Sequence, residues 1–449
     1  MIYLDNNATT RPLTEVVEAM HACLHDAYAN PSSVHQFGQT VRHKVECARE
    51  KVAELLTASP KEIIFTSGGT ESINLAIRGG LRIHPNRRRF VTTAVEHSAV
   101  LRVAEQLAAE GYAVDYIGVD QDGRLNEAEW AEKITDQTAL VSFIHANNET
   151  GVMFDVPRLA AVPAAKGVPI HVDAVQSAGK VPIDVSSWPV QLISIAGHKF
   201  HGPKGVGALY VRRRTRIEPL ILGGSQERLL RGGTENVEGI VGMGVASEIA
   251  IRDCAQTAEH VRQLRDAFES GVQARFCSKI PSPGEGWGEG KTPSPLGEGW
   301  GEGHPASPLA KGGQRGVRQR ASNPAHPSPG LSPQEERSFQ AQPGIPFAHV
   351  VGGGTERIYN TSNIAFEGLE SEAILILLSE AGICASAGAA CSSGSLEPSH
   401  MLKAMGIDER IAHGAIRFSL SRFNTREEID RVVSILPGLL SRLAVLGAP

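Results

Sequence analysis

The sequence has few of the features that mark several large classes of protein. Its six cysteines are spread over 449 residues with no CxxC pair and no cluster with histidine, which argues against a disulfide framework and against a metal site such as structural zinc. No apolar stretch reaches the length of a membrane span. The start, MIYLDNNATTRPL, has no basic segment followed by a long apolar one. We therefore expect no secretory signal and a cytoplasmic location.

A strong excess of charge is also lacking. The net charge is −5 and the pI about 6.4, whereas nucleic-acid-binding domains carry a basic surface, so nucleic acid is not an expected partner. The RRR runs at 87–89 and 212–214 flank strand-like stretches and are interpreted as solvated ends. Hydrophobic residues make up 41% and charged residues 21% of the chain, which is typical of a globular protein of two or three domains at this length.

Between about residues 12 and 255, helical and strand-like stretches alternate. The stretch VRHKVECAREKVAELL at 41–56 has apolar residues at helical spacing. Short apolar runs such as EIIFTSGGT, VPIHVDAVQ and QLISIAGHK end in polar residues. This alternation predicts an open, mainly parallel α/β sheet. Because ligands of such sheets bind beyond the carboxyl ends of the strands, we expect these polar residues to converge on one site.

Residues 281–345 interrupt this pattern. They contain PSPGEGWGEG, a near repeat PSPLGEGWGEG, and then sequence rich in Pro, Ser, Gly and Arg, which predicts a disordered low-complexity insert. After it, the sequence predicts an apolar helix at 372–383, a strand at 415–423 and a helical region at 425–446. We expect a large domain over 12–255 and a smaller one, containing the insert, from 1–11 and 256–449.

Two residues at strand ends suggest chemistry on an aldehyde cofactor. Lys199 in ISIAGHKFHGPKG follows an apolar strand, where desolvation favours a nucleophilic amine; a surface lysine beside a turn fits equally well. Asp173 in PIHVDAVQ ends another apolar strand, where a carboxylate needs a cationic partner such as the ring nitrogen of pyridoxal phosphate. The alternative for Asp173 is a cap of the following turn.

Two further positions could bind other parts of such a cofactor. In FTSGGTES, Gly68, Gly69 and Thr70 lie between a strand and a helix, which is typical of a phosphate site at a helix N-terminus. His97 follows the strand RFVTTAV and could stack on a flat ring, act as acid or base, or simply start a helix. Together the four positions predict a pyridoxal phosphate enzyme.

A cysteine stands in an unusual setting near the end of the chain. The stretch AGAACSSGSLEPSH at 387–400 surrounds Cys391 with alanine, glycine and serine, which are too small and polar to form a core and predict an exposed, mobile loop. A thiol there either has no function or is a nucleophile that the loop must carry from one position to another.

The motifs taken together resemble those of cysteine desulfurases of the NifS/IscS type, in the class V aminotransferase family. The resemblance runs from residue 3 to about 436, apart from the insert. It is carried by YLDNNATT, NPSSVHQFG, IIFTSGGTESINLAI, EHSAVL, NNETG, DAVQSAGK, GHKFHGPKGVG, GGSQERLLRGGTEN, ACSSGSLEPSHMLKAMG and IRFSLSRF. It implies an α/β PLP-dependent transferase fold, with a mainly parallel seven-stranded sheet flanked by helices and a smaller α+β domain.

The resemblance also implies roles for individual residues. Lys199 would bind pyridoxal 5'-phosphate covalently, His97 would stack on its ring and move protons, and Asp173 would pair with the ring nitrogen. The other cofactor contacts would come from Gly69, Thr70, Asn148, Gln176 (to the ring hydroxyl), His198 and, across a homodimer interface, Thr234. Substrate would be bound by Arg417 through its fork of donors, with Asn148 and Asn30 nearby, and Cys391 would attack the substrate sulfur.

The implied reaction converts L-cysteine into L-alanine and leaves a persulfide on Cys391, which an iron–sulfur scaffold or another acceptor protein would take. Nitrogenase maturation, general cluster assembly and tRNA thiolation stay open as destinations. A selenocysteine lyase or an aminotransferase on the same fold is the alternative, and an aminotransferase would not need Cys391. The sequence departs from the family at Ala196, where serine is common before Gly-His-Lys; the missing hydroxyl would cost on the order of 1 kcal/mol of phosphate binding.

Overall fold

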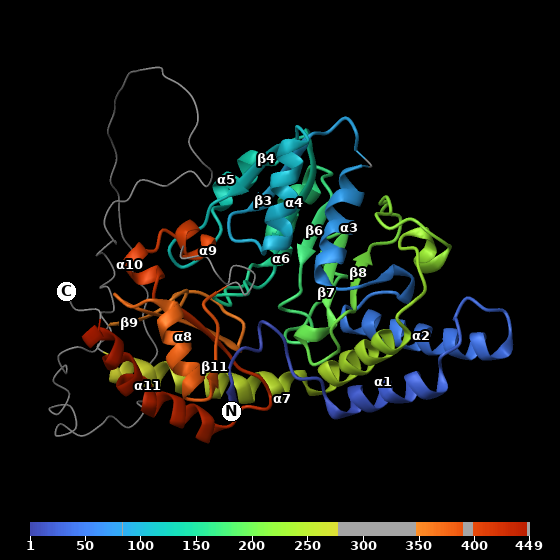
Figure 1. Ribbon diagram of the computed structural model, residues 1–449. Helices are drawn as coiled ribbons and strands as arrows, with labels where there is room; N and C mark the ends of the chain where they lie inside the picture. Colours follow the sequence, from blue (N-terminus) through green and yellow to red (C-terminus); the bar gives the residue numbers. More distant parts are fainter. Residues whose placement is uncertain (83, 277–346, 389–397, 447–449) are drawn as a thin grey trace, which may run out of the picture. The chain divides into compact units, whose positions relative to one another are not determined.

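The computed structural model describes residues 1–82, 84–276, 347–388 and 398–446 (Figure 1). Cys391 and the whole of the predicted insert at 281–345 lie outside the described residues. None of the described helices has both the length and the apolar character needed to cross a membrane.

A seven-stranded sheet in the order β2-β8-β7-β6-β5-β3-β4 forms the centre of the larger part. Its strands are β2 (Ile63–Thr66), β3 (Arg89–Thr93), β4 (Ala113–Ile117), β5 (Thr138–Ile144), β6 (Ile170–Asp173), β7 (Leu192–Ala196) and β8 (Gly207–Val211). β8 is antiparallel to both of its neighbours, and the other pairings are parallel. The mainly parallel seven-stranded sheet expected from the sequence is confirmed.

Helices cover both faces of this sheet because its strands are apolar on both faces. Successive side chains of a strand point to opposite faces, so Ile64 packs in one core cluster while Ile63 and Phe65 pack in another. The helices α3 (Gly69–Leu81) and α4 (Ser98–Ala109) cover the first face. The second face is covered by α1 (Thr14–Asp26), α2 (Gln36–Leu55), α5 (Glu127–Lys133), α6 (Val156–Ala165) and the first half of α7 (Val237–Arg275).

A smaller antiparallel sheet in the order β12-β10-β9 forms around a separate core cluster. Its strands are β9 (Ala348–Val350), β10 (Thr361–Phe366) and β12 (Ala415–Ser419), and a separate parallel pair joins β1 (Ile2–Tyr3) to β11 (Ile383–Cys384). The helices α8 (Ser371–Glu380) and α11 (Arg426–Leu446) pack in this cluster, whereas the buried residues of α9 (His400–Ala404) and α10 (Glu409–Ala412) belong to the core of the larger sheet. The helix, strand and helical region predicted after the insert are therefore present.

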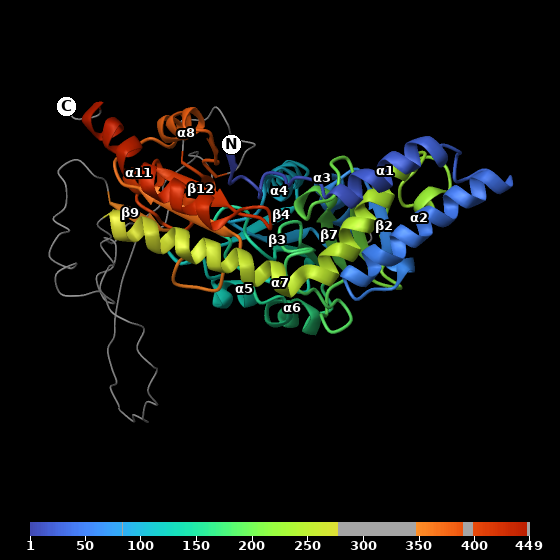
Figure 2. The ribbon, with the colours of Figure 1, turned by 90° about the horizontal axis from the view of Figure 1, so that it is seen from below.

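The helix α7 connects the two sheets, and Figure 2 shows it as one continuous helix. Met243 and Ile249 in its first half belong to the core of the larger sheet, whereas Leu264 and Phe268 in its second half belong to the core of the smaller one. The expected domain boundary at residue 255 falls inside this helix, and the division into two domains stays a prediction.

Candidate active site

A cavity of about 240 Å³ lies at the carboxyl ends of the parallel strands. Nine of the predicted site residues line it: Gly69, Thr70, His97, Asn148, Asp173, Gln176, His198, Lys199 and Arg417. Asp173 is the last residue of β6, Arg417 lies on β12 of the smaller sheet, and the other residues follow strands β2, β3, β5, β6 and β7. The convergence of strand-end side chains expected from the sequence is present, because parallel strands end at one edge of the sheet.

Lys199 enters the cavity from a short 3-10 turn, η2 (Gly197–Lys199), directly after β7. Its Nζ donates hydrogen bonds to the main-chain oxygens of Asn7, at 2.6 Å, and Ala8, at 2.9 Å. The amine is thus half-buried and held by two carbonyl groups at the cavity wall. An amine in that position is available to an aldehyde, and the simple surface-lysine interpretation does not hold.

Asp173 is a buried carboxylate at the end of β6. Burial raises its pKa to about 6, although a hydrogen bond from the Val175 N–H and the charge of Lys199 act in the opposite direction. Its Oδ1 accepts that bond at 2.9 Å, so Asp173 does cap the following turn. It also lines the cavity, where a protonated ring nitrogen would supply the cation that a buried carboxylate needs.

His97 is the N-cap of α4, and its Nδ1 accepts a hydrogen bond from the Ala99 N–H at 3.1 Å. Burial lowers its pKa to about 4, and the charges of Lys199, His400 and Arg417 contribute in the same direction. The imidazole is therefore neutral at pH 7 with its proton on Nε2. The helix-start interpretation applies. The cap also fixes the tautomer of a ring that lines the cavity, so it is compatible with the functional interpretation, which stays a prediction.

The part of the cavity beside the start of α3 suits an anion. Gly69 and Thr70 form the first turn of α3, whose N–H groups have no acceptor within the helix. A Cβ at Gly69 would come within 2.8 Å of Val175 Cγ2, so only glycine allows this close approach. His198 lies beside them, and burial followed by the charges of Lys199, Lys204 and Lys180 lowers its pKa to about 4. Its neutral ring can therefore donate without carrying a charge.

Ala196 is the residue that departs from the family, and it lines this cavity with 1% of its surface exposed. We expect Ala196→Ser to lower the dissociation constant of pyridoxal phosphate about fivefold, because one added hydrogen bond contributes about 1 kcal/mol. Fluorescence titration of the cofactor-free protein measures this constant. Unchanged binding at an unchanged melting temperature would show that no phosphate oxygen lies within reach of position 196.

Arg417 reaches the cavity from β12 and has 2% of its surface exposed. Its Nη1 donates to the Asn148 main-chain oxygen at 3.0 Å, and its Nη2 pairs with Asp5 Oδ1 at 2.8 Å. Its Nε is buried and has no hydrogen-bond partner. A buried guanidinium with an unused donor beside a cavity can take a carboxylate, which binds best to a planar fork.

The sequence analysis assigned no role to the N-terminal segment, which forms one wall of the cavity. Asn7 and Ala8 line it, and Asp5 pairs with Arg417. The segment is fixed to β12, since the Asn7 N–H donates to Ser419 Oγ at 2.9 Å. The polar run in YLDNNATT directly after an apolar start could have indicated this contribution.

Glu96, the neighbour of His97, is a second group that the sequence analysis did not single out. Burial raises its pKa to about 8, and the charge of Asp173 adds to the shift. Its Oε1 accepts hydrogen bonds from Thr93 Oγ1 at 2.6 Å and the Ile144 N–H at 2.9 Å. The protonated acid links the ends of β3 and β5 without adding a charge next to Asp173.

The raised pKa of Glu96 makes the free energy of unfolding depend on pH. Between about pH 4.5 and pH 8 the folded chain keeps a proton that the unfolded chain releases, so stability falls as pH rises through this window. We expect Glu96→Gln to lack this dependence and to gain on the order of 3 kcal/mol relative to wild type between pH 5 and pH 8. Parallel denaturant curves of both proteins measure it; equal slopes against pH would contradict the assignment.

Three predicted site residues are not among those lining the cavity. Asn30 is exposed, and its Oδ1 accepts from the Ser32 N–H at 2.8 Å within its own turn. Thr234 is exposed on the loop before α7, so it is open to contact from another molecule. Cys391 lies outside the described residues.

The residues lining the cavity fit pyridoxal phosphate in their chemistry. They offer an amine, a buried carboxylate for the ring nitrogen, a flat neutral imidazole and a helix N-terminus for the phosphate. No group of three or more metal-ligating side chains is found in the described part of the chain.

Comparison with known proteins gives matches over almost the whole chain. The family model "Aminotransferase class-V" matches residues 2–281 and 339–432. The chain is 41% identical over 446 residues to "Cysteine desulfurase" of Trichormus azollae, covering 99% of this chain and 94% of that protein. It is 41% identical over 443 residues to "Cysteine desulfurase NifS" of Azotobacter vinelandii, covering 98% of this chain and 93% of that protein. The solved structure of a "NIFS-LIKE PROTEIN" is similar, with a TM-score of 0.78 at 33% sequence identity. The match covers 98% of this chain and 100% of that chain.

Proposed function

We propose that this chain, which belongs to the aminotransferase class-V family and to the cysteine desulfurases within it, removes the sulfur of L-cysteine and passes it on from Cys391. L-cysteine and the Cys391 thiol give L-alanine and a persulfide, which conserves all atoms. The observation that carries this assignment to specific residues is that nine of the predicted site residues line one cavity.

Pyridoxal phosphate is the cofactor of this family, and when bound it withdraws electrons from the α-carbon of an amino acid. Lys199 would hold its aldehyde carbon, and the carboxylate of Asp173 would keep the ring nitrogen protonated. Arg417 would orient the substrate by its carboxylate. Since His97 is neutral, its ring can stack on the cofactor and exchange a proton at Nε2 without repelling a neighbouring cation.

The sulfur step requires the Cys391 thiolate to reach the substrate. A bond forms between the two sulfur atoms while the carbon–sulfur bond breaks, and the electron pair left on carbon takes up a proton to give alanine. The described residues on both sides of Cys391 bond to cavity residues or to their neighbours: the Arg417 N–H donates to the Ser386 oxygen at 2.7 Å, and His400 Nε2 donates at 3.1 Å to the oxygen of Glu96, which precedes His97. These contacts support a role for Cys391 at this cavity.

A homodimer is part of the proposal, because Thr234 would contact the cofactor phosphate of a second subunit. The exposed apolar side chains support this, since several lie on α1 and α2 or on the loop that leads to Thr234: Val17, Leu24, Phe37, Ile221, Leu222 and Leu229. An ion pair between Arg49 and Glu227, at 2.7 Å, holds that loop on α2. Light scattering should give twice the mass of the 47.9 kDa chain; a monomer at working concentration would refute this part.

The acceptor of the sulfur is proposed to be another protein, such as an iron–sulfur scaffold. A cytoplasmic location stays a prediction, tested by fractionating cells that express the chain.

The decisive experiment measures products and follows the sulfur. Purified protein with pyridoxal phosphate should form L-alanine from L-cysteine, and mass spectrometry before reductant is added should find one extra sulfur on the peptide that contains Cys391. The other five cysteines of the chain serve as internal controls. Turnover of L-selenocysteine alone, or turnover that requires a keto acid, would favour a selenocysteine lyase or an aminotransferase and refute the proposal.

A further inference from the structure

Lys180 is a buried lysine to which the proposed mechanism gives no role. It follows β6, in the segment DAVQSAGK, and has 7% of its surface exposed. Burial lowers its pKa to about 7, and the charges of Lys199 and Arg417 contribute. Its Nζ donates to Gln176 Oε1 at 3.1 Å, and it forms no ion pair with a carboxylate within the described ranges. Charging a buried amine that has no anion beside it is costly, which is why its pKa is lowered, and an anion bound nearby would favour the charged form.

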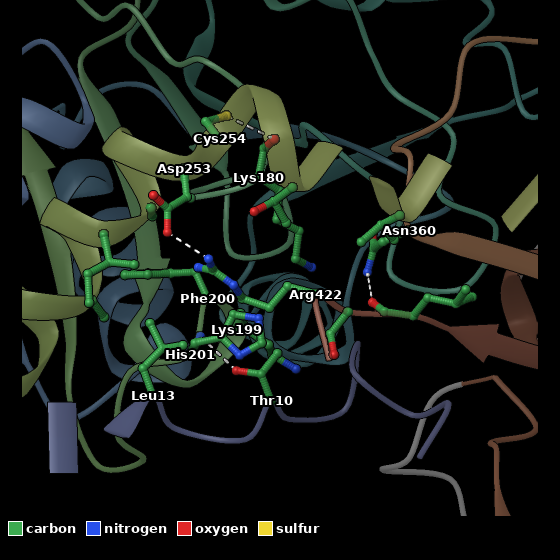
Figure 3. Close-up of a pocket in the computed structure, with 18 of the residues that line it drawn as sticks. Thr10, Leu13, Lys180, Lys199, Phe200, His201, Asp253, Cys254, Asn360 and Arg422 are labelled. Carbon is green, nitrogen blue, oxygen red and sulfur yellow. Dashed lines mark hydrogen bonds and ion pairs between the residues drawn. The ribbon is translucent and has the colours of Figure 1, made fainter. Parts of the chain in front are cut away.

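Lys180 does not line the main cavity. It lies at one end of a chain of hydrogen bonds that leads to Lys199. Gln176 accepts from Lys180 through Oε1 and donates through Nε2 to the Asn7 main-chain oxygen at 2.9 Å. Lys199 Nζ donates to the same oxygen at 2.6 Å. Figure 3 shows Lys180 and Lys199 together in a second, smaller pocket, whereas Gln176 lines the main cavity.

The bond between Lys180 and Gln176 fixes the orientation of the amide. An ammonium group has three donors and no acceptor, so the atom of Gln176 that faces Lys180 must be the oxygen. The amide nitrogen is then the group left for other partners. If Lys180 were replaced by an apolar residue, only the bond to the Asn7 oxygen would hold the amide in this orientation. A turned amide would present its oxygen, which would repel an anion.

We propose that Lys180 is a positioning residue whose ammonium group holds the N–H side of Gln176 toward the cofactor and whose charge is balanced by the anionic ring oxygen of bound pyridoxal phosphate. The inference rests on the proposed assignment of Gln176 to that oxygen. It extends the site to a residue outside the cavity lining and explains why a lysine is buried there without a carboxylate.

The other charged and titratable groups around Lys180 do not replace this role. Lys199, Arg417 and His198 lie on the side of the main cavity. The groups around the smaller pocket are His201, Asp253, Cys254, Tyr359 and Arg422. The two histidines are neutral, since burial is the largest cause that lowers the pKa of each to about 4. The carboxylate of Asp253 is paired with Arg252 and Arg422, which hold its pKa well below the usual range.

The test compares Lys180→Met with wild type, both loaded with pyridoxal phosphate. A nearby positive charge disfavours protonation of the bound cofactor, so its loss should raise the midpoint at which the visible absorption band titrates between pH 5 and pH 10. We expect a rise of about one pH unit, a tenfold change in proton affinity, and about tenfold weaker cofactor binding. Lys180→Arg should stay close to wild type because it keeps the charge.

Lys204→Met is the matched control, because it removes an exposed lysine from the nearby loop after η2 and should leave the midpoint unchanged. Lys180→Gln gives a second variant in case the methionine variant does not fold. If both Lys180 variants keep the wild-type midpoint and affinity and only melt earlier, Lys180 is merely structural and the inference is wrong. If wild type itself binds no cofactor, the proposed function fails, which is a different outcome.

Discussion

Lys199→Ala is expected to lower the rate of alanine formation from L-cysteine at least about 1000-fold, because the amine would be the group that bonds the cofactor. The variant should also lose the visible absorption that the lysine-bound cofactor gives. In the structure the Lys199 amine donates to the main-chain oxygens of Asn7 and Ala8 at the cavity wall. Stopped assays for alanine and absorption spectra measure both effects.

Two further variants separate this chemistry from a structural effect. Lys199→Arg keeps a cation that can bond the same carbonyl groups but cannot bond an aldehyde in the same way, so it should restore the melting temperature without restoring activity. Lys204→Ala removes an exposed lysine from the same loop and should behave as wild type. Alanine formation by Lys199→Ala within tenfold of wild type would remove Lys199 from the mechanism.

The elements that local sequence patterns could predict are those with strong periodicity. The helix expected at 41–56 corresponds to α2 (Gln36–Leu55), which starts earlier and ends one residue sooner, and the apolar helix expected at 372–383 is α8 (Ser371–Glu380). The second prediction runs too far because Gly382 adopts a φ of +77° and Ile383 then pairs with Ile2 in β11 and β1. A strand whose partner lies almost the whole chain away leaves no signal in its own neighbourhood.

The site was predictable where chemistry follows directly after a strand of the large sheet. For Asp173 and His97 the sequence predicted either a cap or a place in the site. In the structure each caps a turn or helix and also lines the cavity. The two roles are compatible, because a cap fixes the orientation that the proposed chemistry would need.

What could not be predicted depends on contacts between distant segments. Asp5 pairs with Arg417 across 412 positions of the chain, and Asn7 accepts from both Gln176 and Lys199. Neither residue ends a strand of the large sheet, so the rule that located the other groups does not apply to them. Their place follows from the docking of the N-terminal segment on β12, where the Asn6 N–H donates to the Ser419 oxygen at 3.1 Å.

Arg417→Lys is expected to lower kcat/KM for L-cysteine about 10- to 100-fold, mainly through KM, because it loses one charge-assisted hydrogen bond to the substrate carboxylate, which contributes about 1.5–3 kcal/mol. Lysine keeps the charge but offers a point donor in place of the planar fork. The fork is already positioned, with Nη1 on the Asn148 oxygen and Nη2 on Asp5. Steady-state kinetics with L-cysteine measure the loss, and the absorption of the bound cofactor should not change.

A substrate without a carboxylate isolates the contact. Cysteamine lacks the group that Arg417 would bind, so its slow turnover should be the same in Arg417→Lys and wild type, whereas turnover of L-cysteine differs. Arg422→Gln is the matched control, because this arginine also pairs with an aspartate, Asp253 at 2.6 Å, but lines only the smaller pocket. An equal loss with both substrates would mean that Arg417 supports the structure of the site through Asp5 and Asn148, and that the substrate carboxylate binds elsewhere.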